Sequence, residues 1–465
     1  MEMKYRPMPE TRAFLHRLYT NWLRIIIIAL CMVVQPVGKA CTIVAVSGRV
    51  TEDGRPLLLK NRDSSSVKTI IKIFRENNHA YLIQCTVGDN GPLSGYNDRG
   101  FAIINSHSYN MPNSSSGWNS YIMQLAIERC TTIDEFEHLL DSLPKPIPVC
   151  SNYGVIDALG HAAIFETSAY TFARYDADSV DCGYLVRTNF SFSQDTTGVY
   201  LLSPNSLPRY EIASNYLEDV FETNEYIAKE HLYGLSRCLV NRYGEDLRDF
   251  APYDEYDTLL VDFRNYVPRF STTSAMIIQG VLPDESPQLA VAWTMLGPPL
   301  VSVTIPYVIT PRNILPQKAQ PGYNGSSWFA YNGQNLKNSC FVDNNTLNLA
   351  KLYNLCGTGI MQTIDSIEGF ILDRGNELVE NYREGLASCF DIEHYYFWVD
   401  EFVEDQYTQF GLLGTTLGIV TEKDDKTEET DNQNMEYYDL MGRPVKNVKD
   451  DAIIKKSGKT GIILN

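Results

Sequence analysis

The sequence lacks the cysteine and histidine spacings that are typical of a protein-bound metal ion. Its ten cysteines form no CxxC pair, and its seven histidines form no HxxxH or HExxH pattern. Zinc and related metals are usually held by such closely spaced ligands. We therefore expect neither a metal ion nor a cofactor.

Positive charge is also scarce. The formal net charge is −18 over 465 residues, although residues 1–40 hold six Lys or Arg against two Asp or Glu. Proteins that bind nucleic acid need a basic surface against the phosphates. The composition excludes that class and favours a small neutral or cationic ligand.

Internal repeats and coiled-coil heptads are absent. A hydrophobic content of 44% is enough for a full core, which argues against extensive disorder. The length fits one large domain or two medium ones.

The first forty residues predict an export signal. Arg12, Arg17 and Arg24 precede the apolar run "IIIIALCMVV" (25–34), and small residues follow up to Ala40. This is the signal-peptide pattern, and the run is too short for a comfortable membrane span. A start at Met3 or Met8, or an uncleaved anchor helix, stays open.

Cys41, directly after this segment, has three interpretations. It is a buried core thiol, a lipid anchor, or the first residue of a mature enzyme. Free cysteine is among the most buried residue types, and Gly38 and Lys39 fit a lipidation signal badly. Nine cysteines remain after cleavage, and an odd number in an exported protein predicts at least one free thiol.

Cleavage after Ala40 would give Cys41 both a thiol and a free α-amine. Such an amine titrates near pH ~7.7–8.0, so it can act as a general base around neutrality. One residue then supplies the nucleophile and its base, which is the N-terminal form of an activated nucleophile.

The residues that follow predict a β-hairpin. "CTIVAVSGR" and "RPLLLKNRD" are apolar runs on either side of "TEDG", which contains an Asp-Gly turn signal. Asp63 closes the second strand, where its carboxylate could orient the amine of Cys41. A solvated acid at the strand end is the alternative.

Four stretches carry a family resemblance. They are the opening "CT" with "LLLKNRD", "SGYNDRGFAIINSH" (94–107), "SNYGVIDALGHAAIFETS" (151–168) and "GYLVRTNFS" (183–191). In order and spacing, over residues 41–310, they resemble cysteine N-terminal nucleophile (Ntn) hydrolases of the isopenicillin-N acyltransferase-like branch. They are more distantly similar to choloylglycine hydrolases, penicillin V acylases and acid ceramidase.

The resemblance implies a role for each matching residue. Cys41 is the nucleophile with its amine as base, and Asp63 is the acid that orients the amine. Asn105 and Asn189 are expected to form the oxyanion hole and the site of the substrate carbonyl. Arg209, in "SLPRYEIAS", falls where the family usually has a supporting arginine.

Two positions depart from the family pattern. The family commonly has Arg three residues before the aspartate, where this chain has Lys60, and Arg62 stands next to the aspartate instead. Either could assist the thiolate, or neither. The strand before Asn105 is also shorter than in choloylglycine hydrolases, and we take His107 as a loop or pocket-wall residue.

Ordinary structural roles remain open for several of these residues. "GYNDRG" is by default a type I turn, Asn189 could cap a strand end, and Arg209 could lie on a helix surface. We interpret Asp157 as turn chemistry and Glu166 as a rim or structural acid.

The implied fold is α+β, a four-layer αββα sandwich with two antiparallel sheets. Helices are expected over 117–130, over the capping-box stretch from Thr132, over 208–221 and near 226–242. The expected parts are a signal peptide (1–40) and a hydrolase domain (41–420), in which 316–420 is a mostly helical extension.

The last two parts are a charged linker and a short tail. "TEKDDKTEETDNQN" (421–434) has no apolar residue and should be disordered. The tail (435–465) resembles C-terminal sorting tails of the type IX secretion pathway, which indicates the periplasm, cell surface or medium of a Gram-negative bacterium. An appended β-hairpin is the alternative.

Two functional hypotheses follow. The first is an exported amidohydrolase that cleaves a linear amide, such as an N-acyl amino acid, a conjugated bile acid or an acylated peptide, with acyl transfer to an amine as an alternative. The second is a surface binding protein on the same scaffold that has lost catalysis. No stable membrane span is expected after signal removal, and the oligomeric state stays open.

Overall fold

The computed structural model describes residues 41–76, 79–111, 117–193, 206–322, 325–413, 453–456 and 459–462. The predicted signal peptide and the charged linker lie outside these residues. Among the described residues, no helix is long and apolar enough to cross a membrane.

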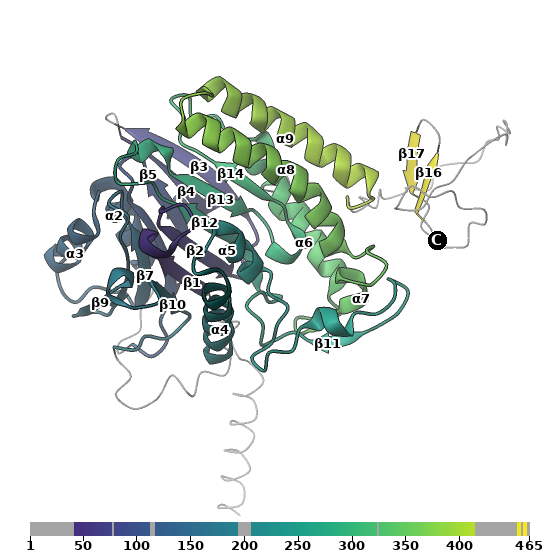
Figure 1. The fold of residues 1–465 in the computed structure, drawn as a ribbon, viewed down its shortest axis with the longest axis horizontal. Helices are drawn as coiled ribbons and strands as arrows, with labels where there is room; N and C mark the ends of the chain where they lie inside the picture. The colour runs from purple at the N-terminus through teal and green to yellow at the C-terminus, as the bar shows by residue number, and fades with distance from the viewer. Residues whose placement is uncertain are drawn as a thin grey trace, which may run out of the picture. The chain divides into compact units, whose positions relative to one another are not determined.

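Two antiparallel sheets form the centre of the fold (Figure 1). The six-stranded sheet has the order β10-β1-β2-β12-β13-β14. Its strands are β1 (Cys41–Val46), β2 (Leu57–Asp63), β10 (Tyr184–Arg187), β12 (Thr272–Gln279), β13 (Val291–Met295) and β14 (Thr304–Tyr307). The predicted hairpin is therefore confirmed, since β1 pairs with β2.

The seven-stranded sheet is a meander in which each strand pairs with the next along the chain. Its strands are β3 (Thr69–Glu76), β4 (His79–Thr86), β5 (Ser94–Asn97), β6 (Ala102–His107), β7 (Ser151–Ile156), β8 (Ala162–Thr167) and β9 (Phe172–Asp176). His107, which we expected in a loop or in a pocket wall, is the last residue of β6, so the loop alternative is wrong.

The two sheets pack face to face. Ile43 and Leu58 of one sheet share an apolar core with Ile104 and Ile164 of the other. Burying both inner faces in this way is the main driving force for stacking two amphipathic sheets. It also brings the ends of β1, β6 and β10 close together, which matters for the site below.

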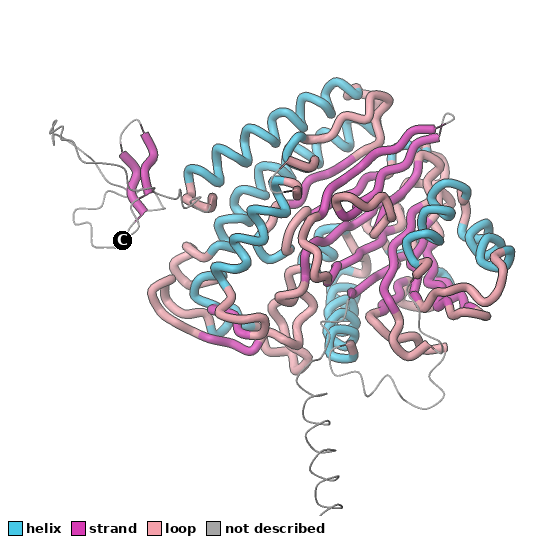
Figure 2. Tube along the Cα trace, turned by 180° about the vertical axis from the view of Figure 1, so that it is seen from behind, coloured by secondary structure: helices cyan, strands magenta, loops and turns pink. Residues whose placement is uncertain are grey.

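Helices cover the outer faces of both sheets (Figures 1 and 2). A second core joins α2 (Asn119–Arg129) and α3 (Ile133–Ser142) to the seven-stranded sheet. The predicted capping box at Thr132 and Glu135 begins α3. The predicted α+β sandwich of two antiparallel sheets between helices is confirmed.

The helices that pack beside the six-stranded sheet all follow β10 in the chain. They are α4 (Leu207–Asn224), α5 (Lys229–Ser236), α6 (Trp328–Cys340), α7 (Leu349–Leu352), α8 (Ile360–Arg383) and α9 (Cys389–Gln409). The helix expected near 226–242 is shorter, because Arg237 leaves helical geometry and the chain then turns at Gly244.

Two small sheets complete the description. β11 (Leu260–Asp262) pairs with β15 (Thr346–Asn348), and β16 (Ile453–Lys456) pairs with β17 (Lys459–Ile462). The second pair shows that the tail contains a β-hairpin.

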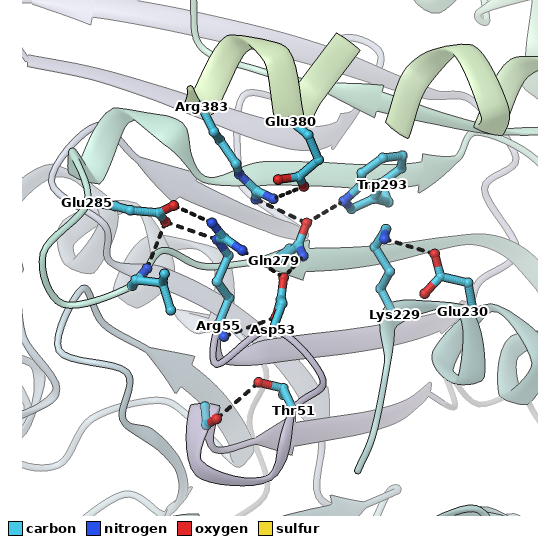
Figure 3. A network of polar contacts seen from close by, with 12 residues as sticks. Thr51, Asp53, Arg55, Lys229, Glu230, Gln279, Glu285, Trp293, Glu380 and Arg383 are labelled. Atoms are coloured by element: carbon cyan, nitrogen blue, oxygen red, sulfur yellow. Dashed lines mark hydrogen bonds and ion pairs between the residues drawn. The ribbon is translucent and has the colours of Figure 1, made fainter. Parts of the chain in front are cut away.

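A polar network ties the β1–β2 turn to the far end of β12 and to α8 (Figure 3). Arg55 pairs with Asp53 and Glu285, and Asp53 accepts a hydrogen bond of 2.6 Å from Gln279 Nε2. Arg383 of α8 donates to Gln279 Oε1. The C-terminal helices therefore pack on the sheet core.

Candidate active site

Cys41 is the first residue of β1 and lies directly opposite Arg62 of β2. Paired residues on antiparallel strands share a face, so Cys41, Arg62 and Lys60 point to the same side of the sheet. Lys60 Nζ donates to Asn105 Oδ1 of β6 at 2.7 Å, which shows that this side faces the seven-stranded sheet. Cys41 is a free thiol, and the residue is 8% exposed.

Asn189 and Arg209 meet at Cys41. The Cys41 nitrogen, which in the full chain is the peptide N–H that joins Cys41 to Ala40, donates to Asn189 Oδ1 at 2.9 Å. Arg209 donates to the same Oδ1 at 2.8 Å and to the Cys41 carbonyl oxygen at 2.7 Å. Because a guanidinium has only donors, these bonds fix the amide oxygen of Asn189 toward Cys41.

Arg209 is a buried cation and not a surface helix residue. It stands in the first turn of α4, is 1% exposed and also donates to Thr42 Oγ1 at 3.0 Å. Burial, followed by repulsion from Arg269, lowers the pKa of Arg209 to about 9, although attraction to Asp63 and Cys41 opposes that shift. The guanidinium still carries its positive charge at neutral pH.

The Asp63 carboxylate is buried, at 3% exposure, so a solvated strand-end acid is ruled out. Oδ2 accepts from Arg269 Nε at 2.9 Å, and Oδ1 accepts from Thr272 Oγ1 at 2.6 Å. No hydrogen bond joins Asp63 to Cys41 among the described residues. Asp63 directly follows Arg62, the partner of Cys41 across the strands, so its role toward a free amine stays a prediction.

Lys60 and Arg62 have different surroundings on the face that they share. Lys60 also donates to the Leu93 carbonyl oxygen at 2.5 Å. Arg62 donates to Thr273 Oγ1 at 2.8 Å and to Ser64 Oγ at 2.9 Å. Burial lowers the pKa of Arg62 to about 10, and attraction to Cys41 and then to Asp63 acts in the opposite direction.

Asn105 is placed one step away from this group. Its Oδ1 accepts from Lys60, and its Nδ2 donates to Ser151 Oγ at 3.1 Å. The structure thus brings Cys41, Asn189 and Arg209 into direct contact, with Arg62 opposite. Asn105 contacts Lys60, whose side chain lies on the same face of the sheet as Cys41 and Arg62.

Asn152 of β7 holds the backbone on both sides of Asn189. Its Nδ2 donates to the carbonyl oxygens of Thr188 (3.2 Å) and Phe190 (2.9 Å), and its Oδ1 accepts from Ser191 Oγ at 2.5 Å. The side chain is completely buried. All of its polar atoms are therefore used to fix the segment that carries Asn189.

Sequence reasoning missed Asn152, Arg269 and Thr272. Arg269 is 206 positions from the carboxylate that it binds. Asn152 lies within a stretch that we read only as strand–turn–strand. No local pattern marks these residues, because their partners are set by strand pairing between distant segments.

Asp157 and Glu166 have the structural roles that we expected. Asp157 Oδ1 accepts from the backbone nitrogens of Leu159 and His161 within a turn. Glu166 is buried, pairs with Arg187 Nε at 2.6 Å and accepts from two backbone nitrogens of residues 192 and 193. No group of three or more His, Cys, Asp or Glu that could hold a metal occurs in the described part of the chain.

Comparison with known proteins gives one family match. Residues 50–243 match the model of the acyl-coenzyme A:6-aminopenicillanic acid acyl-transferase family. This confirms the resemblance predicted from the sequence. The matched segment contains Asp63, Asn105, Asn189 and Arg209, and it begins after Cys41. A search of curated proteins found no match.

Solved structures with similarity to the chain include three amide hydrolases. A conjugated bile acid hydrolase from Clostridium perfringens is 13% identical, with 58% of this chain and 92% of that chain covered and a TM-score of 0.36. A penicillin V acylase from Agrobacterium tumefaciens is 14% identical (58% and 87% covered, TM-score 0.35). An N-acylethanolamine-hydrolyzing acid amidase ortholog from Caenorhabditis elegans is 14% identical (52% and 94% covered, TM-score 0.35).

Proposed function

We propose that the mature protein is a cysteine Ntn amidohydrolase that cleaves a linear amide through an acyl-thioester on Cys41. The observation that carries this proposal is the contact of Asn189 and Arg209 with the nitrogen and carbonyl oxygen of Cys41. A structural cysteine in a strand would not need a buried guanidinium and an amide on its own backbone. The family match supports acyl transfer as the general chemistry.

The proposed reaction needs Cys41 and one water molecule besides the substrate. The free α-amine of Cys41 takes the thiol proton, and the thiolate attacks the amide carbonyl carbon. The resulting ammonium then gives its proton to the leaving amine as the C–N bond breaks, which leaves the acyl group on sulfur. Water, deprotonated by the same amine, hydrolyses the thioester and regenerates the thiol.

The charges around Cys41 suit this sequence of steps. Arg62 lies opposite Cys41, Lys60 shares its face, and Arg209 touches its backbone. Cations at these places stabilise a thiolate and a developing oxyanion in a dry site. In the structure Asn189 turns its oxygen to the Cys41 nitrogen, and its Nδ2 donates to the His107 carbonyl oxygen. The oxyanion role of Asn189 and Asn105 therefore stays a prediction.

Acyl transfer is the second candidate. The matched family is described as an acyl-transferase, so an amine could resolve the thioester in place of water. The substrate proposed in either case is a small amide, such as an N-acyl amino acid, a conjugated bile acid or an acylated peptide. Supplying a competing amine and identifying the products by mass spectrometry separates the two outcomes.

We also propose that the protein is exported, with a Gram-negative periplasm, cell surface or medium as its destination. The support is the basic and apolar pattern of residues 1–40 and the tail sequence. Export would provide the cleavage that frees the amine of Cys41, whether by a signal peptidase or by the chain itself.

The test uses full-length protein matured in a Gram-negative host. We expect turnover of at least one N-acyl amide in a mixed panel, and no turnover with Cys41→Ala. A thiol-directed probe should label Cys41 faster than any other cysteine. Equal activity of Cys41→Ala, or faster labelling at another cysteine, would refute the enzyme hypothesis, and the latter favours a binding protein on this scaffold.

A further inference from the structure

Lys337 is a buried lysine that makes no ion pair among the described residues. It lies near the end of α6 and is 2% exposed. Its Nζ donates to the Phe270 carbonyl oxygen at 2.5 Å and lies 4.4 Å from the centroid of the Phe270 ring. No carboxylate lies within ion-pair distance of Nζ among the described residues. A buried ammonium without such a partner is costly, so its presence calls for a reason.

The segment that Lys337 contacts is the one that holds Asp63. Phe270 stands between Arg269 and Thr272, and these two residues bind the two carboxylate oxygens of Asp63. One short segment therefore connects the ammonium to the carboxylate. Phe270 also packs on Phe341 just beyond α6, with ring centroids 5.3 Å apart.

Electrostatics points to the same connection. Burial lowers the pKa of Lys337 to about 8, and attraction to Asp63 opposes that shift. The other charged groups around Asp63 are Arg269, which binds it, and Arg62 and Arg209, which are attracted to it. Asp63 is thus the carboxylate whose attraction acts on the Lys337 ammonium.

We propose that Lys337 is a positioning residue for Asp63, acting through Phe270 and through its charge. The hydrogen bond fixes the segment 269–272, whose Arg269 and Thr272 side chains bind Asp63, and the ammonium adds positive charge to the surroundings of that carboxylate. This inference rests on the proposed function. It makes α6, which lies outside the family-matched segment, part of the catalytic apparatus.

The experiment compares Lys337→Met, Lys337→Arg and the control Lys351→Met, which changes an exposed lysine of α7. Each mature enzyme is assayed for kcat and KM across pH. We expect Lys337→Met to lower kcat roughly tenfold or more with KM within about twofold. The acid limb of kcat/KM should move to higher pH by about half a unit, because loss of a nearby cation lets the amine hold its proton more tightly.

Lys337→Arg should keep the wild-type acid limb, and Lys351→Met should match the wild type throughout. An unchanged kcat and acid limb in Lys337→Met would overturn the proposal. So would equal losses in both Lys337 variants with no pH shift, which would indicate packing alone. If Lys337→Met does not fold, a displaced acid limb in folded Lys337→Arg overturns it and a retained one supports it.

Failure of the proposed function would appear differently. The wild-type enzyme itself would then show no turnover that depends on Cys41. The two failures are therefore distinguished before any Lys337 variant is made.

Discussion

Replacing Lys337 by methionine should change how the stability of the protein depends on pH. Methionine has a similar length and no charge, so it can fill the same buried space. The variant removes one ammonium that the folded state holds away from water. The free energy of unfolding should respond in a way that can be calculated from the structure.

The size of the effect comes from the pKa of Lys337, which falls from 10.5 to about 8 on folding. The folded state therefore binds this proton more weakly than the unfolded state does. Below pH 8 the folded state bears the full free-energy cost of the buried Lys337 ammonium. Between pH 8 and 10.5 the folded state has lost the proton and the unfolded state has not, so wild-type stability rises by up to about 1.4 kcal/mol per pH unit, or about 3 kcal/mol in total.

Removing the buried ammonium stabilises Lys337→Met, but loss of its hydrogen bond offsets part of that stabilisation. The Phe270 carbonyl oxygen would lose its donor, which costs about 1–3 kcal/mol in a buried place. At pH 7 we therefore expect Lys337→Met to be as stable as the wild type or more stable by up to about 2 kcal/mol. Above pH 10 it should be the less stable of the two.

Urea unfolding of the wild type and of Lys337→Met at pH 7, 8, 9 and 10, in the presence of a reductant, gives two curves of unfolding free energy against pH. The difference between them reports the loss of Lys337, together with any change that this loss causes in the groups that it attracts. Lys351→Met serves as the control and should run parallel to the wild type. Parallel curves for Lys337→Met would refute the reasoning, since they would mean that folding does not perturb this ammonium.

Three further variants test the site and its support. Arg209→Lys should lower kcat/KM about 10- to 100-fold in steady-state assays, because a single ammonium cannot bind Cys41 and Asn189 together as the guanidinium does. Asn152→Asp should lower kcat about 100-fold with little change in KM, because a carboxylate cannot donate to the carbonyl oxygens that flank Asn189, and wild-type kcat would contradict this. Arg55→Leu should reduce the unfolding free energy by about 1–3 kcal/mol in urea titrations and leave kcat unchanged, since it breaks the network of Figure 3 far from Cys41.

Local sequence patterns predicted the parts of the fold that depend on neighbouring residues. The hairpin around "TEDG", the capping box at Thr132 and the α4 helix all follow from turn, capping and periodicity rules. The family resemblance also predicted the two antiparallel sheets between helical layers. By contrast, the helix near 226–242 ends early at Arg237, whose guanidinium binds the Pro299 and Ser302 carbonyl oxygens and Glu368 in distant segments.

The site shows the same division. Cys41, Asn189 and Arg209 were predicted, and the structure brings them into contact. Arg269 and Lys337 were not, because they come near Asp63 only after β12 has paired with β2 and α6 has packed beside β12. The burial and the partners of these two residues depend on that packing, so no spacing in the sequence marks them.

The central claim is that maturation leaves Cys41 with a free thiol and a free amine. Intact-mass and N-terminal sequencing of the active protein from a Gram-negative host test it most directly, together with mass-spectrometric trapping of the acyl group. We expect the chain to begin at Cys41 and the acyl group to be held on that residue. An active protein that begins upstream of Cys41, or that carries a blocked nitrogen on Cys41, would contradict the mechanism.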